Sequence, residues 1–257
     1  MEAMGAAEFI EVLRREGALM AAVAEKAGIT AGVPTCPDWQ VSDLVRHQGI
    51  VHRWAAGFVA ERLTTPVPPA GDAPGDEELL PWFREGHQHL VDSLAAAPAD
   101  LDCWFFFPAP SALEFWARRQ AHETTVHRVD AEATLGVNPS PIAADFAADG
   151  VDELLAGFHV RTKSQVRTDR PRTLRVRAVD VPAGQGEWLV HLSADPLRTE
   201  RGSVSDSGSG GGDADCAVHG TAEELYLALW NRGPYEGLEI SGDASIMELW
   251  RRTAAIV

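Results

Sequence analysis

The sequence has few basic residues and no long apolar run, and each shortage argues against a class of protein. Its 257 residues include 22 Lys and Arg against 38 Asp and Glu, which gives a formal net charge of −16. Nucleic-acid binding needs a surplus of basic groups that neutralise phosphates, so this balance argues against nucleic acid and against anionic membranes. No stretch approaches the roughly 20 apolar residues of a membrane span.

Cysteine is also scarce. Cys36, Cys103 and Cys216 are odd in number, widely spaced and outside any C-x-x-C pattern, which argues against a disulfide framework and against a thiolate zinc site. The N-terminal segment lacks the basic and apolar regions of a secretory signal, so we expect a cytoplasmic protein. Hydrophobic residues at 45% and charged residues at 23% are typical of a globular protein.

Apolar residues recur at helical spacing through the first half of the chain, and stretches rich in proline and glycine separate the runs. This pattern predicts four long helices that form a bundle. Asp38 or Ser42 can cap the second helix, and Gly28 lies near the end of the first. The expected helices cover residues 6–29, 42–58, 76–96 and 111–135.

The second half alternates apolar and polar residues, which is typical of strands. Thr221, with Glu224 three residues later, predicts a capped helix start. The Gly/Ser run over 202–212 indicates a flexible turn or hairpin loop. The expected elements are helices over 145–162, 222–230 and 244–253 and strands over 174–179, 188–193 and 238–240.

These patterns together predict an α+β protein with two domains. Residues 1–160 would form the helical bundle, and residues 161–257 would form a smaller α+β domain.

The densest cluster of polar side chains lies on the fourth expected helix. Glu123 and His127 are four residues apart, so they share one helix face and can share a metal ion. His122 and His127 are five residues apart and point roughly 140° away from each other. The H-E-x-x-x-H spacing therefore departs from the H-E-x-x-H pattern of zinc proteases.

A catalytic zinc needs three protein ligands and one open position. His47 is the best third ligand because it lies among apolar positions on the expected inward side of the second helix, whereas His52 points toward the polar side. Asp130, three residues beyond His127, can orient that imidazole. The alternative is a hydrogen-bonded core histidine at position 47 and a solvated or inter-helix polar stripe on the fourth helix, and spacing does not separate the two.

Three segments of the chain carry motifs that are typical of a single protein family. They read P-T-C-P-D-W-Q-V-S-D-L-V-R-H up to His47, H-E-T-T-V-H-R-V-D-A-E from His122 to Glu132, and A-D-C-A-V-H-G-T-A-E-E-L-Y-L-A-L-W-N-R from Ala214 to Arg232. Together they resemble the mycothiol-dependent maleylpyruvate isomerase family over nearly the whole chain. The resemblance implies a DinB-like four-helix bundle that holds a divalent metal, followed by a smaller α/β domain.

The resemblance also implies site residues and partners. His47, Glu123 and His127 would bind the metal, with zinc expected, and Arg232 would pair with a substrate carboxylate. The metal would lower the pKa of the mycothiol thiol, and the thiolate would attack a small electrophile. In an isomerase the thiol adds to maleylpyruvate and leaves after bond rotation, whereas in an S-transferase it stays attached. The expected protein is a monomer or homodimer, and the sequence indicates no thiol-binding residues.

Two other functions remain open on the sequence. In a non-catalytic metal-binding module or regulator, Asp130 or His122 would supply a fourth ligand. In a metal-dependent hydrolase, Asp130 or a nearby carboxylate would act as general base. Arg232 has an alternative of its own, because an arginine at a helix C-terminus commonly binds the last carbonyls.

Two further groups of residues are interpreted as structural. His87 is expected at the solvent or at the bundle edge, as is His89, because they face different sides of the third helix. The aromatic run from Trp104 to Phe107 is expected to be a buried or inter-domain anchor.

Overall fold

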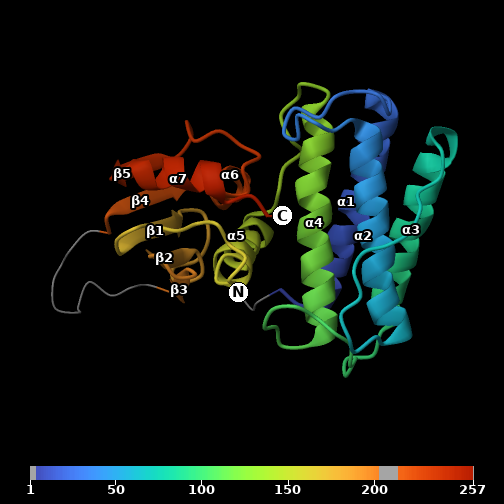
Figure 1. Ribbon diagram of the computed structural model, residues 1–257, viewed down its shortest axis with the longest axis horizontal. Helices are drawn as coiled ribbons and strands as arrows, with labels where there is room; N and C mark the ends of the chain where they lie inside the picture. The colour runs from blue at the N-terminus through green and yellow to red at the C-terminus, as the bar shows by residue number, and fades with distance from the viewer. Residues whose placement is uncertain (1–3, 203–213, 257) are drawn as a thin grey trace. The chain divides into compact units, whose positions relative to one another are not determined.

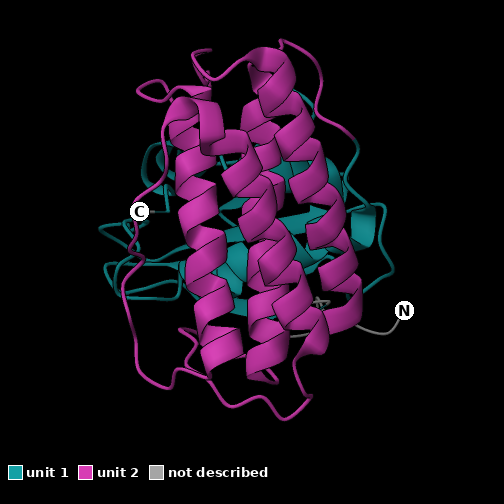
Figure 2. Ribbon diagram, turned by 90° about the vertical axis from the view of Figure 1, so that its right-hand side faces the viewer, with its two compact units in different colours: residues 1, 141–257 teal, residues 2–140 magenta. Residues whose placement is uncertain are grey.

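The computed structural model describes residues 4–202 and 214–256. The predicted Gly/Ser loop lies outside the described residues, apart from Gly202 at its start. The chain forms two compact units, residues 2–140 and 141–257, which Figure 2 shows in magenta and teal.

Four long helices form the first unit and lie side by side (Figures 1 and 2). The predicted four-helix bundle and the α+β class are confirmed. The third helix has the bounds expected from the sequence, and the others differ by a few residues at their ends. The helices are α1 (Ala6–Ala27), α2 (Val41–Glu61), α3 (Asp76–Ala96) and α4 (Ala112–Ala133).

The start of α2 differs from the prediction. The N-cap residue is Gln40, whose backbone N–H donates to Asp43 Oδ2 at 2.9 Å. Ser42 is already inside the helix, and Asp38 lies in the preceding turn, where the Trp39 N–H donates to the Cys36 carbonyl. The prediction that Asp38 or Ser42 caps α2 is therefore wrong, because this turn carries the chain two residues beyond Asp38 before helical geometry begins.

Helices α1 and α3 approach each other closely at Gly17. A Cβ atom at this position would lie 2.2 Å from Cε1 of His87, far inside van der Waals contact. His87 is 7% exposed, so the expectation of a solvent or bundle-edge histidine is wrong for this residue, whereas His89 is exposed. The missing side chain at Gly17 makes the space that buries the imidazole, and spacing along α3 alone does not reveal it.

The aromatic run between α3 and α4 packs on the bundle. The Trp104 ring lies 5.2 Å from that of Phe58, and the Phe106 ring lies 4.7 Å from that of Phe115. Phe107 is buried. The run anchors this connection on α2 and α4, in agreement with its interpretation as a structural anchor.

The second unit is a five-stranded sheet with helices, in the order β3-β2-β1-β4-β5. β1 pairs in parallel with β4, and the other pairs are antiparallel. The strands are β1 (Arg172–Ala178), β2 (Glu187–Leu192), β3 (Arg198–Arg201), β4 (Cys216–Gly220) and β5 (Glu239–Gly242). The helices are α5 (Ala144–Asp152), which continues as a π-helical turn over Glu153–Phe158, α6 (Ala222–Leu229) and α7 (Ser245–Thr253).

The predicted start of the helix after Thr221 is confirmed. Thr221 Oγ1 accepts from the Glu224 N–H at 3.2 Å, and Glu224 Oε2 accepts from the Thr221 N–H at 2.9 Å, which is the predicted capping box. The two compact units divide between Ser140 and Pro141, earlier than the expected boundary between 160 and 161. The difference arises because α5 packs against α6 in the second unit.

Candidate metal centre

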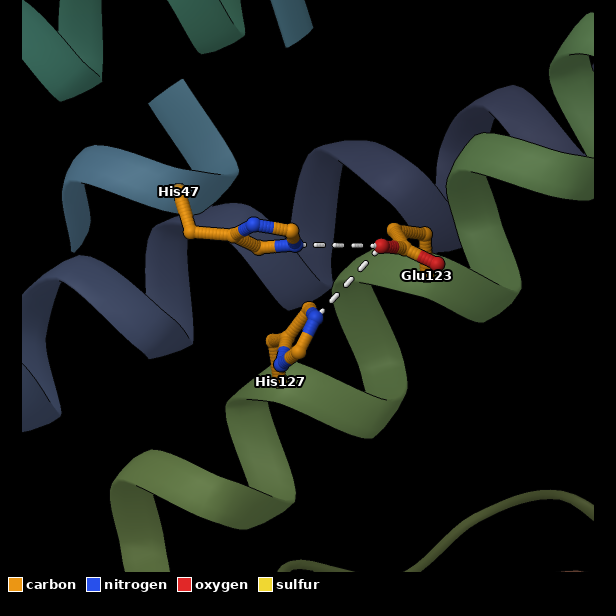
Figure 3. Close-up of side chains that lie close together, drawn as sticks. All are labelled: His47, Glu123 and His127. Carbon is orange, nitrogen blue, oxygen red and sulfur yellow. Dashed lines mark ion pairs between the residues drawn. The ribbon is translucent and has the colours of Figure 1, made fainter. Parts of the chain in front are cut away.

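His47 from α2 meets Glu123 and His127 from α4 (Figure 3). Glu123 Oε1 lies 3.5 Å from His47 Nε2 and 3.4 Å from His127 Nε2. One potential ligand atom of each residue lies within 4.8 Å of those of the other two. The side chains are 38%, 24% and 10% exposed in the order His47, Glu123 and His127, so the centre lies at the edge of the bundle core.

A chain of two hydrogen bonds links the His127 imidazole to Asp130 and Asp130 to Thr35. Its Nδ1 lies 2.9 Å from Oδ2 of Asp130, which is fully buried, and Thr35 Oγ1 donates to Oδ1 of the same carboxylate at 2.5 Å. Asp130 holds the Nδ1 side of the ring, and Nε2 is the nitrogen that faces Glu123. Asp130 thus has the position expected for a residue that orients a ligand imidazole.

The two oxygens of the Glu123 carboxylate have different partners. Oε1 faces both imidazoles, while Oε2 accepts from Nη2 of the buried Arg119 at 2.9 Å. Burial alone would raise the pKa of Glu123, but hydrogen bonds from His127 and His47 and the charge of Arg119 hold this pKa well below its ordinary value. The carboxylate is therefore ionised and ready to bind a cation.

The same contacts act on His127 in the opposite direction. Burial lowers its pKa, yet the hydrogen bonds to Asp130 and Glu123 outweigh burial and raise the pKa to about 9. A metal ion that binds to Nε2 therefore displaces a proton at neutral pH, since ligand histidines must be neutral.

The two histidines of α2 have exchanged the places that the sequence indicated. His47 was expected on the core face and is the most exposed of the three candidate ligands, beside the Trp39 indole at a ring distance of 5.1 Å. His52 was expected toward the polar side and is fully buried. The two side chains lie on different sides of α2, as predicted, but α3 and α4 pack against the side that carries His52.

The donor set fits a zinc ion. Two imidazole nitrogens and one carboxylate oxygen are a common catalytic set. Among the described residues, the group of potential ligands contains these three and neither of the suggested fourth ligands. Asp130 is bonded to Thr35 and His127, and the His122 ring, fully buried, lies 6.0 Å from that of Phe9.

Arg232 lies in the second unit, just after α6. Its Nη1 donates to the carbonyl of Trp230, the C-cap residue, at 2.9 Å, and its backbone N–H donates to the Leu227 carbonyl at 2.7 Å. These bonds are those of an arginine that satisfies helix-end carbonyls, the alternative expected for this position. A catalytic role for Arg232 remains a prediction.

Sequence reasoning missed two residues that shape the centre. Arg119 precedes Glu123 by four positions, so the spacing rule that paired Glu123 with His127 could have found it. Thr35 contacts Asp130 across 95 positions, and no local signal points to that contact.

The chain matches two family models. The Mycothiol maleylpyruvate isomerase N-terminal domain matches residues 11–132, and the MDMPI C-terminal domain matches residues 145–247. No curated protein sequence matches the chain. None of the described helices is both long enough and apolar enough to cross a bilayer.

Two solved structures share the fold. One is a crystal structure of the mycothiol-dependent maleylpyruvate isomerase, with a TM-score of 0.62 and 13% sequence identity. The other is a histidine-to-alanine mutant of the mycothiol-dependent maleylpyruvate isomerase, with a TM-score of 0.63 and 12% identity. Each alignment covers 94% of this chain and 96% of the other.

Proposed function

Because the chain belongs to the mycothiol maleylpyruvate isomerase family, we propose that it is a metal- and mycothiol-dependent enzyme that acts on a small electrophile. The observation that carries the metal part of this proposal is the convergence of His47, Glu123 and His127. When bound, zinc would supply a Lewis acid that lowers the pKa of a coordinated thiol, so that the thiol would be a thiolate at neutral pH.

The chain's own residues would bind the ion and orient its ligands. His47 and His127 would each use Nε2, and Glu123 would use Oε1. Asp130 would hold the His127 proton at Nδ1, and Arg119 would hold the second oxygen of Glu123. The Trp39 ring lies beside both imidazoles, 5.1 Å from that of His47 and 6.3 Å from that of His127, and would cover one side of the centre.

The reaction would follow from a thiolate held beside an electrophile. In isomerisation, the sulfur forms a bond to one carbon of the maleylpyruvate double bond, rotation follows, and the same carbon–sulfur bond breaks to give fumarylpyruvate. In S-transfer, the carbon–sulfur bond remains. Arg232 would pair with a carboxylate of the substrate.

Metal analysis tests the centre. We expect bound zinc in the wild type and loss of zinc from His47→Ala and His127→Ala, because two ligands hold the ion much less tightly than three. The exposed His89 on α3 provides a matched control, and His89→Ala should keep its zinc. If neither substitution at the centre lowers the zinc content, the assignment of these ligands is wrong.

A product assay tests the chemistry. The zinc-loaded protein is incubated with mycothiol and maleylpyruvate, and separately with mycothiol and model electrophiles. Fumarylpyruvate would support isomerisation, and conjugates without fumarylpyruvate would support S-transfer. If zinc is bound but neither product forms, the result would favour the non-catalytic metal-binding module over the enzyme. Hydrolysis that needs no thiol would favour the hydrolase.

A further inference from the structure

Three buried polar side chains form a cluster between α2 and α4. Gln48 Nε2 donates to Thr124 Oγ1 at 3.1 Å and lies 2.8 Å from His52 Nε2, which itself lies 2.9 Å from Thr124 Oγ1. All three residues are fully buried. The Thr124 hydroxyl is thus bonded to two side chains of the facing helix.

The cluster adjoins the candidate metal ligands on both helices. Gln48 follows His47 directly on α2, and Thr124 follows Glu123 directly on α4. A hydrogen bond that holds Gln48 or Thr124 in place therefore also holds the backbone of the neighbouring ligand, His47 or Glu123. His47 is the ligand that comes from α2, so its reach toward α4 depends on how the two helices are aligned along their axes.

Apolar packing does not set this alignment sharply. Burial of apolar surface is non-directional, and a slip of one helical turn would move a side chain by about 5.4 Å. Hydrogen bonds have narrow ranges of length and angle, and a buried polar group that loses its partner is costly. A buried polar cluster therefore favours one alignment of two helices over its neighbours.

We propose that Gln48, His52 and Thr124 are positioning residues that fix the alignment of α2 against α4 and hold His47 within reach of Glu123 and His127. This inference rests on the metal-dependent function proposed above. It assigns to the three residues no contact with metal, thiol or substrate.

The electrostatic state of the cluster is compatible with a nearby cation. Burial, together with the facing charges of His87, Arg53 and His127, lowers the pKa of His52 well below its ordinary value, although the charge of Glu123 acts in the opposite direction. The ring is therefore neutral at neutral pH and does not repel a metal ion.

Neighbouring threonines on α4 provide a matched pair of variants. Thr124 and Thr125 are both fully buried and both lie within two positions of Glu123. Thr125 Oγ1 donates to the Ala121 carbonyl of its own helix at 2.8 Å, whereas Thr124 bonds across to α2. Changing either residue to valine removes one hydroxyl from α4. Only Thr124→Val also removes the hydrogen bonds to α2.

The test measures zinc affinity by chelator competition and the visible spectrum of the cobalt-substituted protein. We expect Thr124→Val to bind zinc about 10- to 100-fold more weakly, as found when residues that orient metal ligands are lost, and to change the cobalt spectrum. Thr125→Val should keep the wild-type affinity and spectrum. Thr124→Ser, which retains the hydroxyl, should restore both.

The possible results distinguish a failure of this positioning role from a failure of the proposed metal-dependent function. Equal zinc affinities for the two valine variants, or an equal loss in both, would overturn the positioning role and leave the metal centre intact. A wild type that binds no zinc would overturn the centre and the inference together. If Thr124→Val does not fold, Gln48→Met, which keeps the side-chain length without the amide, is measured instead and should show the same loss of affinity.

Discussion

The two units of the chain bury different kinds of side chain. In the bundle, α4 buries charged and polar residues along most of its length, among them Arg119, His127, Arg128 and Asp130. In the second unit, the buried face of the sheet is apolar, and Glu153 and His159 are the charged or polar residues found buried among the described positions.

The two units differ in how they accommodate charged side chains. Buried polar groups are costly unless they are bonded, and in the bundle they form bonded sets around the candidate metal centre. The second unit instead has its ion pairs near the surface, such as Arg172 with Asp215 and Asp243. Substitutions of matched residues in the two units should therefore have unequal effects.

The largest expected effect is at Arg128. This fully buried arginine donates to Glu16 at 2.7 Å and to Glu132 at 2.5 Å. Arg128→Met would remove the buried cation that Glu16 and Glu132 share and leave Glu16 paired with the more exposed Arg15, so it should lower the free energy of unfolding by about 3–5 kcal/mol. Arg172→Met in the second unit, at a partly exposed pair, should cost under about 1 kcal/mol. Denaturant titration of both variants checks this contrast, and equal losses would contradict it.

Acid should destabilise the second unit through His159. Burial, and secondarily the charge of Arg167, lowers the pKa of this histidine to about 4. The unfolded chain then binds the proton more tightly than the folded one, so stability is complete above about pH 6.5 and falls as the pH drops toward 4, by up to about 3 kcal/mol.

The measurement for His159 is the free energy of unfolding at several pH values. His159→Gln should flatten the loss between pH 6.5 and 4, because the titrating group is gone. His191→Gln, at a half-exposed histidine of the same unit, should retain the wild-type loss. An unchanged acid profile in His159→Gln would show that other groups cause the loss.

A smaller effect is expected at Gly17, where α1 and α3 approach. Gly17→Ala would drive its Cβ into the His87 ring and should cost about 1–3 kcal/mol. Gly57 on α2 has open space around it, so Gly57→Ala should stabilise the helix by about 0.5–1 kcal/mol. Thermal unfolding of the two variants should show midpoints shifted in opposite directions.

The smallest effect on stability is expected at Arg232. Arg232→Ala removes the side-chain bond to the Trp230 carbonyl, and the loss of that bond should cost about 1 kcal/mol or less. If the guanidinium also pairs with a substrate carboxylate, kcat/KM should fall by more than this small cost explains. An unchanged kcat/KM would leave Arg232 with its capping role.

Much of the bundle was predictable because its signals are local. The bounds of α3 and the start of α4 near Ser111 depend on residues within a few positions of one another, as does the capping box at Thr221 in the second unit. The i,i+4 rule also placed Glu123 beside His127. The strands β3 and β4 were missed, because they are short and β4 pairs in parallel with β1 across a long stretch of sequence.

The sequence by itself determined the helices, the spacing of Glu123, His127 and Asp130 on α4, and the family. The tertiary structure alone decided that His47 lies at the edge and His52 in the core, that Thr35 holds Asp130, and that Gly17 makes room for His87. The physical reason is that helical periodicity gives the angle between two side chains on one helix, whereas the packing of the neighbouring helices decides which side of that helix faces the core.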